Sequence, residues 1–196
     1  ITGTNLSTAT SVSVGGTVAA FTVIGPTQIT ATTPAGSAGP ADIVVMTAGG
    51  SETLAGAFTY VPAPTLTSIS PQDGPTGGGT SVVIIGTDLS TTTSVSIGGT
   101  VATFTVNGPT QITATTPAGS AGPADVVVTT AGGNDTLSGA FTYVPAPTLT
   151  SVSPANGPLG GGTVVVISGT NLSNATSVLF GGTAATGFTV ISPTQI

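Results

Sequence analysis

The chain repeats itself every 83 residues, and this period constrains its fold more than any other feature. The string GTNLS at residues 3–7 returns as GTDLS at residues 86–90 and as GTNLS at residues 169–173. The string AFTYVPAPTLTS at residues 57–68 returns at residues 140–151. A repeated segment of this length is large enough to be a domain with its own core. The sequence therefore predicts tandem copies of one small domain.

The joints between the copies are expected at the VPAPT strings, residues 61–65 and 144–148, because two prolines in four residues make a stiff, extended connection. This division gives a complete module at residues 64–146. It leaves two partial modules, one at residues 1–63 that lacks about the first 20 residues of the repeat and one at residues 147–196 that holds only its first half. Two explanations remain open: the sequence is a piece of a longer polypeptide, or a neighbouring chain supplies the missing strands by donor-strand complementation.

Every apolar run in the complete module is short, rich in β-branched residues and bounded by Gly or Pro, which is typical of strands. We predict seven strands and no helix, with a tight hairpin at Gly98–Gly99 and loops at residues 71–79 and 117–124. The strands are expected at residues 65–70, 80–86, 93–97, 100–106, 111–116, 125–130 and 135–144. The pattern predicts an all-β, immunoglobulin-like antiparallel β-sandwich. Its predicted core is Ile69, Val82, Ile84, Val95, Ile97, Phe104, Val106, Ile112, Val126, Val128, Phe141 and Tyr143.

The order of the motifs resembles that of an IPT/TIG domain. The complete module has an S-x-x-P…GP…GGT opening, a G-T-D-L step, a GG hairpin and a terminal F-x-Y, and the partial modules carry the matching pieces. Domains of this family have an immunoglobulin-like fold and occur in transcription factors, plexin-type receptors and many bacterial surface proteins. The resemblance implies tandem immunoglobulin-like modules that act as spacers, stalks or adhesive fibres of a bacterial surface protein.

The charge inventory excludes several classes of partner. The chain has no Lys, Arg or His, and its six acidic residues are Asp42, Glu52, Asp73, Asp88, Asp125 and Asp135. Nucleic-acid binding and attachment to anionic membranes both depend on Lys and Arg. No run of 18 or more apolar residues is present to span a bilayer. We therefore expect no nucleic-acid partner and no membrane insertion, and the DNA-binding role of the transcription-factor branch does not carry over.

The residues needed for catalysis are missing as well. A nucleophilic Ser or Thr needs an activating base, and the chain has no His, Lys or Cys. The acid at position 88 is Asn5 and Asn171 in the sister modules, and the acid at position 73 is Asn156. Only the 42/125 and 52/135 positions therefore stay acidic in both available copies. We expect Asp125 and Asp135 to lie towards opposite ends of the sandwich, too far apart for paired chemistry. The GPTGGGT string at residues 74–80 lacks the Lys of a phosphate-binding loop and leads into a strand. We expect no enzyme activity and no cofactor.

Two kinds of modification or ligand site remain as candidates. Calcium prefers six to eight oxygen ligands, and one or two carboxylates per module offer few. Solvated surface acids are the simpler explanation, and if calcium binds we expect it at Asp42 or Asp125. Asn-x-Ser/Thr sequons are candidate glycosylation sites, although they arise by chance in a chain rich in Ser and Thr. They occur at Asn5, Asn134, Asn171 and Asn174.

These observations favour a structural subunit of an extracellular filament, stalk or surface fibre. Edge strands are usually guarded by charge, and here they are not, so self-association with neighbouring modules or chains is expected. The alternative is an adhesin stalk or an accessory carbohydrate-binding module of a larger secreted protein. Sugar sites use exposed aromatic rings, and this chain has no Trp, two Tyr and six Phe, mostly at core positions of the pattern. Glycan contacts are therefore expected only through other parts of a full-length protein.

Overall fold

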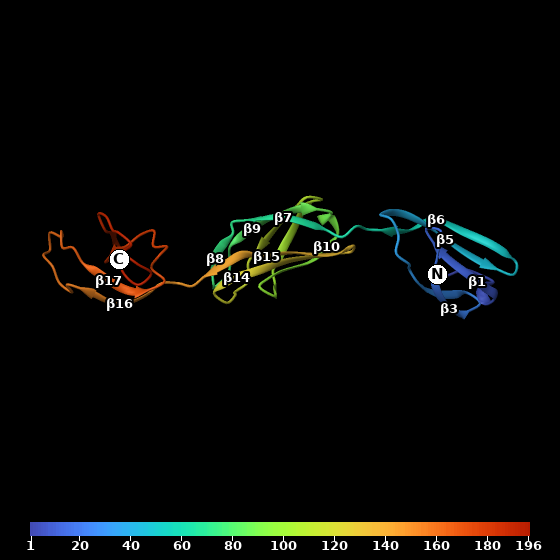
Figure 1. Cartoon of the computed structure of the whole chain (residues 1–196), viewed down its shortest axis with the longest axis horizontal. Helices are drawn as coiled ribbons and strands as arrows, with labels where there is room; N and C mark the ends of the chain where they lie inside the picture. Colours follow the sequence, from blue (N-terminus) through green and yellow to red (C-terminus); the bar gives the residue numbers. More distant parts are fainter.

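The computed structural model describes residues 1–196. Figure 1 shows three β-rich bodies in a row, joined by two extended linkers. We refer to residues 1–63, 64–146 and 147–196 as the first, middle and third modules. Apart from two single-turn 3-10 helices, η1 (Leu6–Thr8) and η2 (Leu89–Thr91), all regular elements are strands. The prediction of an all-β chain of tandem immunoglobulin-like sandwiches is confirmed. The structure holds no helix long and apolar enough to cross a membrane.

The middle module is a complete sandwich of two sheets. One sheet has five strands in the order β11-β10-β14-β15-β8, and the other has four in the order β12-β13-β9-β7. The strands are β7 (Thr65–Ser70), β8 (Asp73–Pro75), β9 (Ser81–Thr87), β10 (Thr92–Ile97), β11 (Thr100–Val101), β12 (Thr103–Gly108), β13 (Gln111–Thr115), β14 (Gly122–Thr130) and β15 (Gly133–Val144). The predicted hairpin at Gly98–Gly99 has positive φ at both residues, 61° and 79°, as a tight two-residue turn requires.

A single core of 15 buried residues fills the space between these sheets. Of the twelve predicted core residues, ten belong to it, and Phe104 and Val106 are partly buried against it. The sequence pattern missed five members that are alanines or lie near strand ends: Leu66, Leu89, Ala102, Ala114 and Ala124.

Three predicted boundaries in the middle module were wrong. The strand expected at residues 100–106 is two strands, because the chain crosses at buried Ala102 from one sheet to the other. The loop expected at residues 71–79 contains β8, which runs parallel to the end of β15. Pro75 made a strand look unfavourable here, because proline in a sheet is confined to edge positions. Strand β8 satisfies this condition, since it lies at the edge of its sheet. Strand β14 begins at Gly122 inside the loop expected at 117–124, so Asp125 lies within the strand and not at its start.

The first module has the same plan with fewer strands. Its larger sheet has the order β2-β1-β5-β6, and β3 and β4 form a separate pair. The strands are β1 (Ala9–Val14), β2 (Thr17–Val18), β3 (Ala20–Gly25), β4 (Gln28–Thr32), β5 (Gly39–Thr47) and β6 (Gly50–Tyr60). No strand corresponds to β7 or β8 of the middle module. As a result Phe58 and Tyr60 are only partly buried, whereas the equivalent Phe141 and Tyr143 are buried.

The third module contains the opening strands of the repeat. They are β16 (Thr148–Ser153), β17 (Val166–Thr170), β18 (Leu179–Phe180) and β19 (Thr183–Ala184). Strand β16 pairs with β17 as β7 pairs with β9 in the middle module. Leu149 is 68% exposed, while the equivalent Leu66, which lies in the complete sandwich, is 7% exposed. The comparison shows that the second half of the repeat covers this strand.

Candidate functional site

Asp42 and Asp125, the candidate calcium ligands, each stabilise a bulge between two strands. One carboxylate oxygen of Asp125 accepts a hydrogen bond from the Gly139 N–H at 2.7 Å, and Asp42 accepts one from the Gly56 N–H at 2.7 Å. Gly139 and Gly56 have φ of +59° and +58°, in the left-handed region that favours glycine. The pairing register shifts beside Asp125 and beside Asp42. Retention of an acid in both copies therefore has a structural explanation in the bulge.

No group of three or more His, Cys, Asp or Glu side chains that could hold a metal ion is present in the structure. Asp42 and Asp125 are both exposed. Calcium binding at either of them stays a prediction, and an unchanged melting temperature on addition of EDTA would contradict it.

Asp135 makes a contact that its counterpart Glu52 does not. The Asp135 carboxylate accepts hydrogen bonds from the Leu66 N–H at 2.7 Å and the Thr136 N–H at 2.8 Å. These two donors, with Leu66 the stronger, lower the pKa of Asp135 below the usual value of 3.8. The Glu52 carboxylate makes no hydrogen bond in the structure. The Asp135 contact joins β15 to the first residues of β7, across the two sheets of the sandwich.

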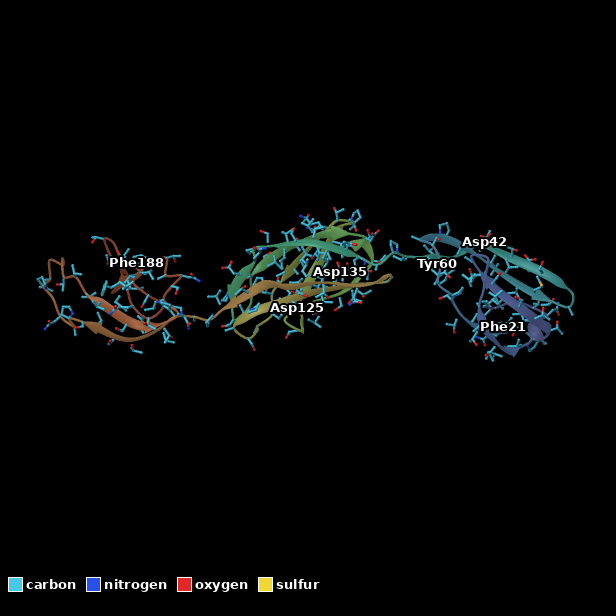
Figure 2. The ribbon with its side chains drawn as sticks, viewed as in Figure 1. Phe21, Asp42, Tyr60, Asp125, Asp135 and Phe188 are labelled. Atoms are coloured by element: carbon cyan, nitrogen blue, oxygen red, sulfur yellow. The ribbon has the colours of Figure 1, made fainter.

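Asp125 and Asp135 lie on opposite faces of one sheet and not at opposite ends of the sandwich. Asp135 pairs across the strands with Val128, whose side chain is buried, so Asp135 faces the other sheet. Asp125 lies between buried Ala124 and Val126 and is exposed on the outer face, because alternate residues of a strand point to opposite faces. Figure 2 labels both residues. The sheet between them keeps the two carboxylates from acting on one bond.

The alternation between Asp and Asn at position 88 has a backbone explanation. Asp88, Asn5 and Asn171 have φ of 58°, 59° and 56°, and each precedes a tight turn. Asn and Asp are the non-glycine residues that tolerate this left-handed conformation best. The turn inserts the next residue, Leu89 in the middle module, into the core at 0% exposure. The side-chain charge at this position is therefore dispensable, and the conformation is not. The sixth acid, Asp73, is exposed in edge strand β8.

The glycine-rich string at residues 74–80 closes one end of the sandwich. The N–H groups of Gly78, Gly79 and Thr80 bond to Pro75 O at 2.9 Å, Thr116 O at 2.8 Å and Thr116 Oγ1 at 3.0 Å. Gly78 has φ of +75°, and a Cβ there would lie 2.5 Å from the Pro117 carbonyl carbon. The amides that would cradle a phosphate are occupied within the fold, so these glycines serve chain packing.

The four sequon asparagines, Asn5, Asn134, Asn171 and Asn174, are all exposed. Asn171 also donates from Nδ2 to the Ala146 carbonyl at 3.1 Å, which ties its corner to the second linker. Glycosylation at these residues stays a prediction.

Two open hollows of about 860 and 1000 Å³ lie along the third module. The second is lined by Phe180 and Phe188, which are 48% and 39% exposed, and Figure 2 labels Phe188. In the middle module the equivalent residues, Ile97 and Phe104, belong to or pack against the core. The hollows therefore correspond to space that β14 and β15 fill in the complete sandwich, and their aromatic rings occupy core positions of the repeat.

The comparisons with known proteins identify the module. The family described as IPT/TIG domain matches residues 1–60, 64–144 and 147–196. None of the curated proteins compared matches the chain. Among solved structures, the plexin A4 extracellular region of domains 1 to 10 is 24% identical, with a TM-score of 0.49, covering 86% of this chain and 15% of that one.

Bacterial structures are also similar in fold. SGBP-B from a xyloglucan utilization locus in Bacteroides uniformis is 20% identical, with a TM-score of 0.39 and coverage of 74% of this chain and 44% of that one. A surface glycan-binding protein from Prevotella bryantii is 20% identical, with a TM-score of 0.36 and coverage of 69% and 34%. The chain thus spans less than half the length of each of these proteins. The family matches cover nearly every residue, and the chain belongs to the IPT/TIG domain family, with three matching segments in tandem.

Proposed function

We propose that the chain is a non-enzymatic spacer array of an extracellular filament, stalk or surface fibre. The observation that carries the proposal is the end-to-end arrangement of the modules in Figure 1. Its cause lies in the topology of the middle module. Strand β8 follows the end of β7 and runs parallel to the end of β15, so the chain leaves the module at the end opposite its entry. Each added module therefore adds length.

The chemistry of the surface supports an exposed, extracellular location. Without Lys or Arg the chain has no trypsin-type cleavage site, and without His, Lys or Cys it has no common activating base or thiol nucleophile. Both properties suit a passive spacer. They do not suit an enzyme.

The edge strands support the proposal that these modules self-associate. In the four-stranded sheet of the middle module the edges are β7 and β12, whose sequences TLTSIS and TFTVNG carry no charge. Free edges of this kind present unpaired N–H and C=O groups to other chains, and charge is the usual guard against such pairing. Edge pairing with neighbouring chains is the proposed mechanism of lateral assembly.

Electron microscopy of the chain at high concentration tests this mechanism, with Thr105→Lys as the decisive variant. Thr105 is exposed on edge strand β12, and a lysine there would guard the edge. Thr142→Lys adds the same charge to an exposed position on β15, an inner strand, and is the matched control. Filaments or bundles that persist in the control and disperse in Thr105→Lys would support edge pairing. Dispersed monomers of the unmodified chain, with its modules intact, would overturn it.

The alternative role is an adhesin stalk or an accessory carbohydrate-binding module of a larger secreted protein. One protein of similar fold, PbSGBP-B from Prevotella bryantii, is a surface glycan-binding protein. For this chain, glycan contacts through other parts of a longer protein fit better, because the exposed phenylalanines of the third module occupy core positions of the repeat. A glycan-array screen of the 196-residue chain separates the roles, since specific binding would favour the carbohydrate-binding alternative.

A further inference from the structure

The linker between the first and middle modules lies directly on a hairpin of the middle module. A Cβ at Gly132, in the β14–β15 turn, would collide with the Pro62 carbonyl oxygen and would lie 2.6 Å from the Val61 carbonyl oxygen. A Cβ at Gly133 would lie 3.3 Å from the Ala63 Cβ. The backbone of the linker therefore occupies the space that side chains would take at this turn. In Figure 1 the β14–β15 hairpin reaches the end of the middle module that the linker enters.

Asp135 fixes the chain just after the linker. Its carboxylate accepts the hydrogen bond from the Leu66 N–H, at 2.7 Å, as β7 begins. Pro64 and Leu66 are buried here, whereas Pro147 and Leu149 at the equivalent positions of the third module are exposed. The β14–β15 hairpin thus contacts the linker through its tip and the start of β7 through Asp135.

The turn has its shape without a linker resting on it. In the middle module Thr130 Oγ1 accepts the Gly132 N–H at 3.2 Å and donates to the Gly133 carbonyl at 3.3 Å. In the first module Thr47 makes the same two bonds with Gly49, at 3.2 Å, and Gly50, at 3.1 Å, and no linker contacts that turn. The surface is therefore built into the module and does not depend on its occupant.

We propose that the hairpin tip, residues 130–133, is a docking surface for the Val-Pro-Ala segment that leaves the preceding module, and that this contact fixes the angle between consecutive modules. The occupant is identified by the Val61–Ala63 backbone that is seated on the tip. The complete module carries both halves, with the tip at residues 130–133 beside the point where the chain enters and a Val-Pro-Ala segment at residues 144–146 where the chain leaves. The first module's tip, residues 47–50, is a free copy of the same surface. The inference does not require that the array act as a spacer.

The test is Gly132→Ala in the whole chain, with Gly49→Ala as its matched control. At Gly49 the only atom within 4 Å of an added Cβ is Thr47 Oγ1, at 3.7 Å. The chain has no cysteine of its own, so single-molecule energy transfer between dyes on Thr30→Cys and Thr105→Cys reports the angle between the modules. Domains without a substantial interface move relative to each other. We therefore expect the distribution of energy-transfer efficiency to be about twice as broad in Gly132→Ala and to stay unchanged in Gly49→Ala.

A second variant distinguishes loss of the docking contact from misfolding of the middle module. Asp135→Ala removes the bond to Leu66 without adding atoms, and Glu52→Ala is its matched control because the Glu52 carboxylate makes no hydrogen bond. Broadening in Gly132→Ala and Asp135→Ala, with both modules still melting cooperatively, supports docking. An unchanged distribution in either variant, or equal broadening in the controls, overturns it. Filament formation is measured separately by microscopy, so failure of the docking inference and failure of the spacer proposal are distinguishable.

Discussion

Replacing Phe141 with Ala tests whether the four-stranded sheet of the middle module buries the core residues of β15. Phe141 in the middle module and Phe58 in the first module lie in the same AFTYVPAPTLTS string. Each packs edge-to-face on the tyrosine two residues on, at ring-centroid distances of 5.0 and 4.9 Å. The local contacts are thus the same, and the difference is that β7, the strand of the four-stranded sheet that contacts β15, has no counterpart in the first module. Comparing Phe141→Ala with Phe58→Ala therefore separates the stability that comes from burial beneath the other sheet from the stability that comes from the contact with the tyrosine.

The expected magnitudes follow from burial. Phe141 is 0% exposed, and truncating a fully buried Phe to Ala costs about 3–5 kcal/mol. Phe58 is only partly buried, so its truncation removes fewer contacts and leaves a space already open to water. We expect a loss of about half as much, roughly 1.5–2.5 kcal/mol. In a domain of this size 1 kcal/mol shifts the melting temperature by about 4–8 °C, so the difference between the variants is well resolved.

Native-state hydrogen exchange followed by mass spectrometry measures both modules in one chain. Peptides from β5–β6 and β14–β15 differ in mass because Ile43 and Glu52 replace Val126 and Asp135. Phe141→Ala should lower the opening free energy of the β14–β15 amides by the larger amount, and Phe58→Ala that of the β5–β6 amides by the smaller amount. Equal losses of opening free energy in the two modules would show that the four-stranded sheet does not account for the burial of Phe141.

Two further predictions concern single positions. Asp88→Ala should destabilise the middle module by about 1–2 kcal/mol because Ala tolerates the left-handed backbone poorly, whereas Asp88→Asn should be neutral in the same thermal melt; equal losses would contradict the backbone explanation. Burial raises the pKa of Tyr143, so its contribution to stability is complete below about pH 10 and is lost as pH rises through the raised value. Tyr143→Phe should remove this loss of stability at high pH and should cost about 1 kcal/mol at neutral pH, because the hydrogen bond to the Pro117 carbonyl is lost. Urea unfolding from neutral to alkaline pH measures both effects, and an equal alkaline loss in the unmodified chain and in Tyr143→Phe would contradict the assignment.

The parts of the fold that were predictable are those encoded locally. Short β-branched runs bounded by glycine or proline predicted strands such as β9 and β13, and their pattern identified Ile84 and Ile112 as core. The division at Ala102 was not predictable in this way, because the chain changes sheets there without a glycine or proline to mark it. Its N–H instead bonds to the Val95 carbonyl at 2.9 Å, a contact that only the folded sandwich reveals.

The candidate sites were predictable only as positions, since their chemistry depends on distant partners. Comparing the copies singled out residues 125 and 135 as retained acids. It could not show that Asp125 bonds to a glycine 14 residues away or that Asp135 bonds to Leu66 69 residues away. The contact of Gly132 with the linker could not be predicted, because an ordinary turn glycine and one that a linker rests on look alike in sequence. The repeat itself holds the only clue, since AGG recurs at residues 48–50 and 131–133.

The absence of cations determines how such an array holds itself together. No side-chain ion pair can form between modules, so added salt has no attractive pair to screen. The joint depends on backbone packing at Gly132 and on one carboxylate, Asp135, that binds backbone N–H groups. The pKa of Asp135 is lowered in the folded chain, so its contribution is present above about pH 3.8 and is lost only as pH falls through the lowered value. Strong acid, and not ionic strength, is therefore the condition that weakens this contact.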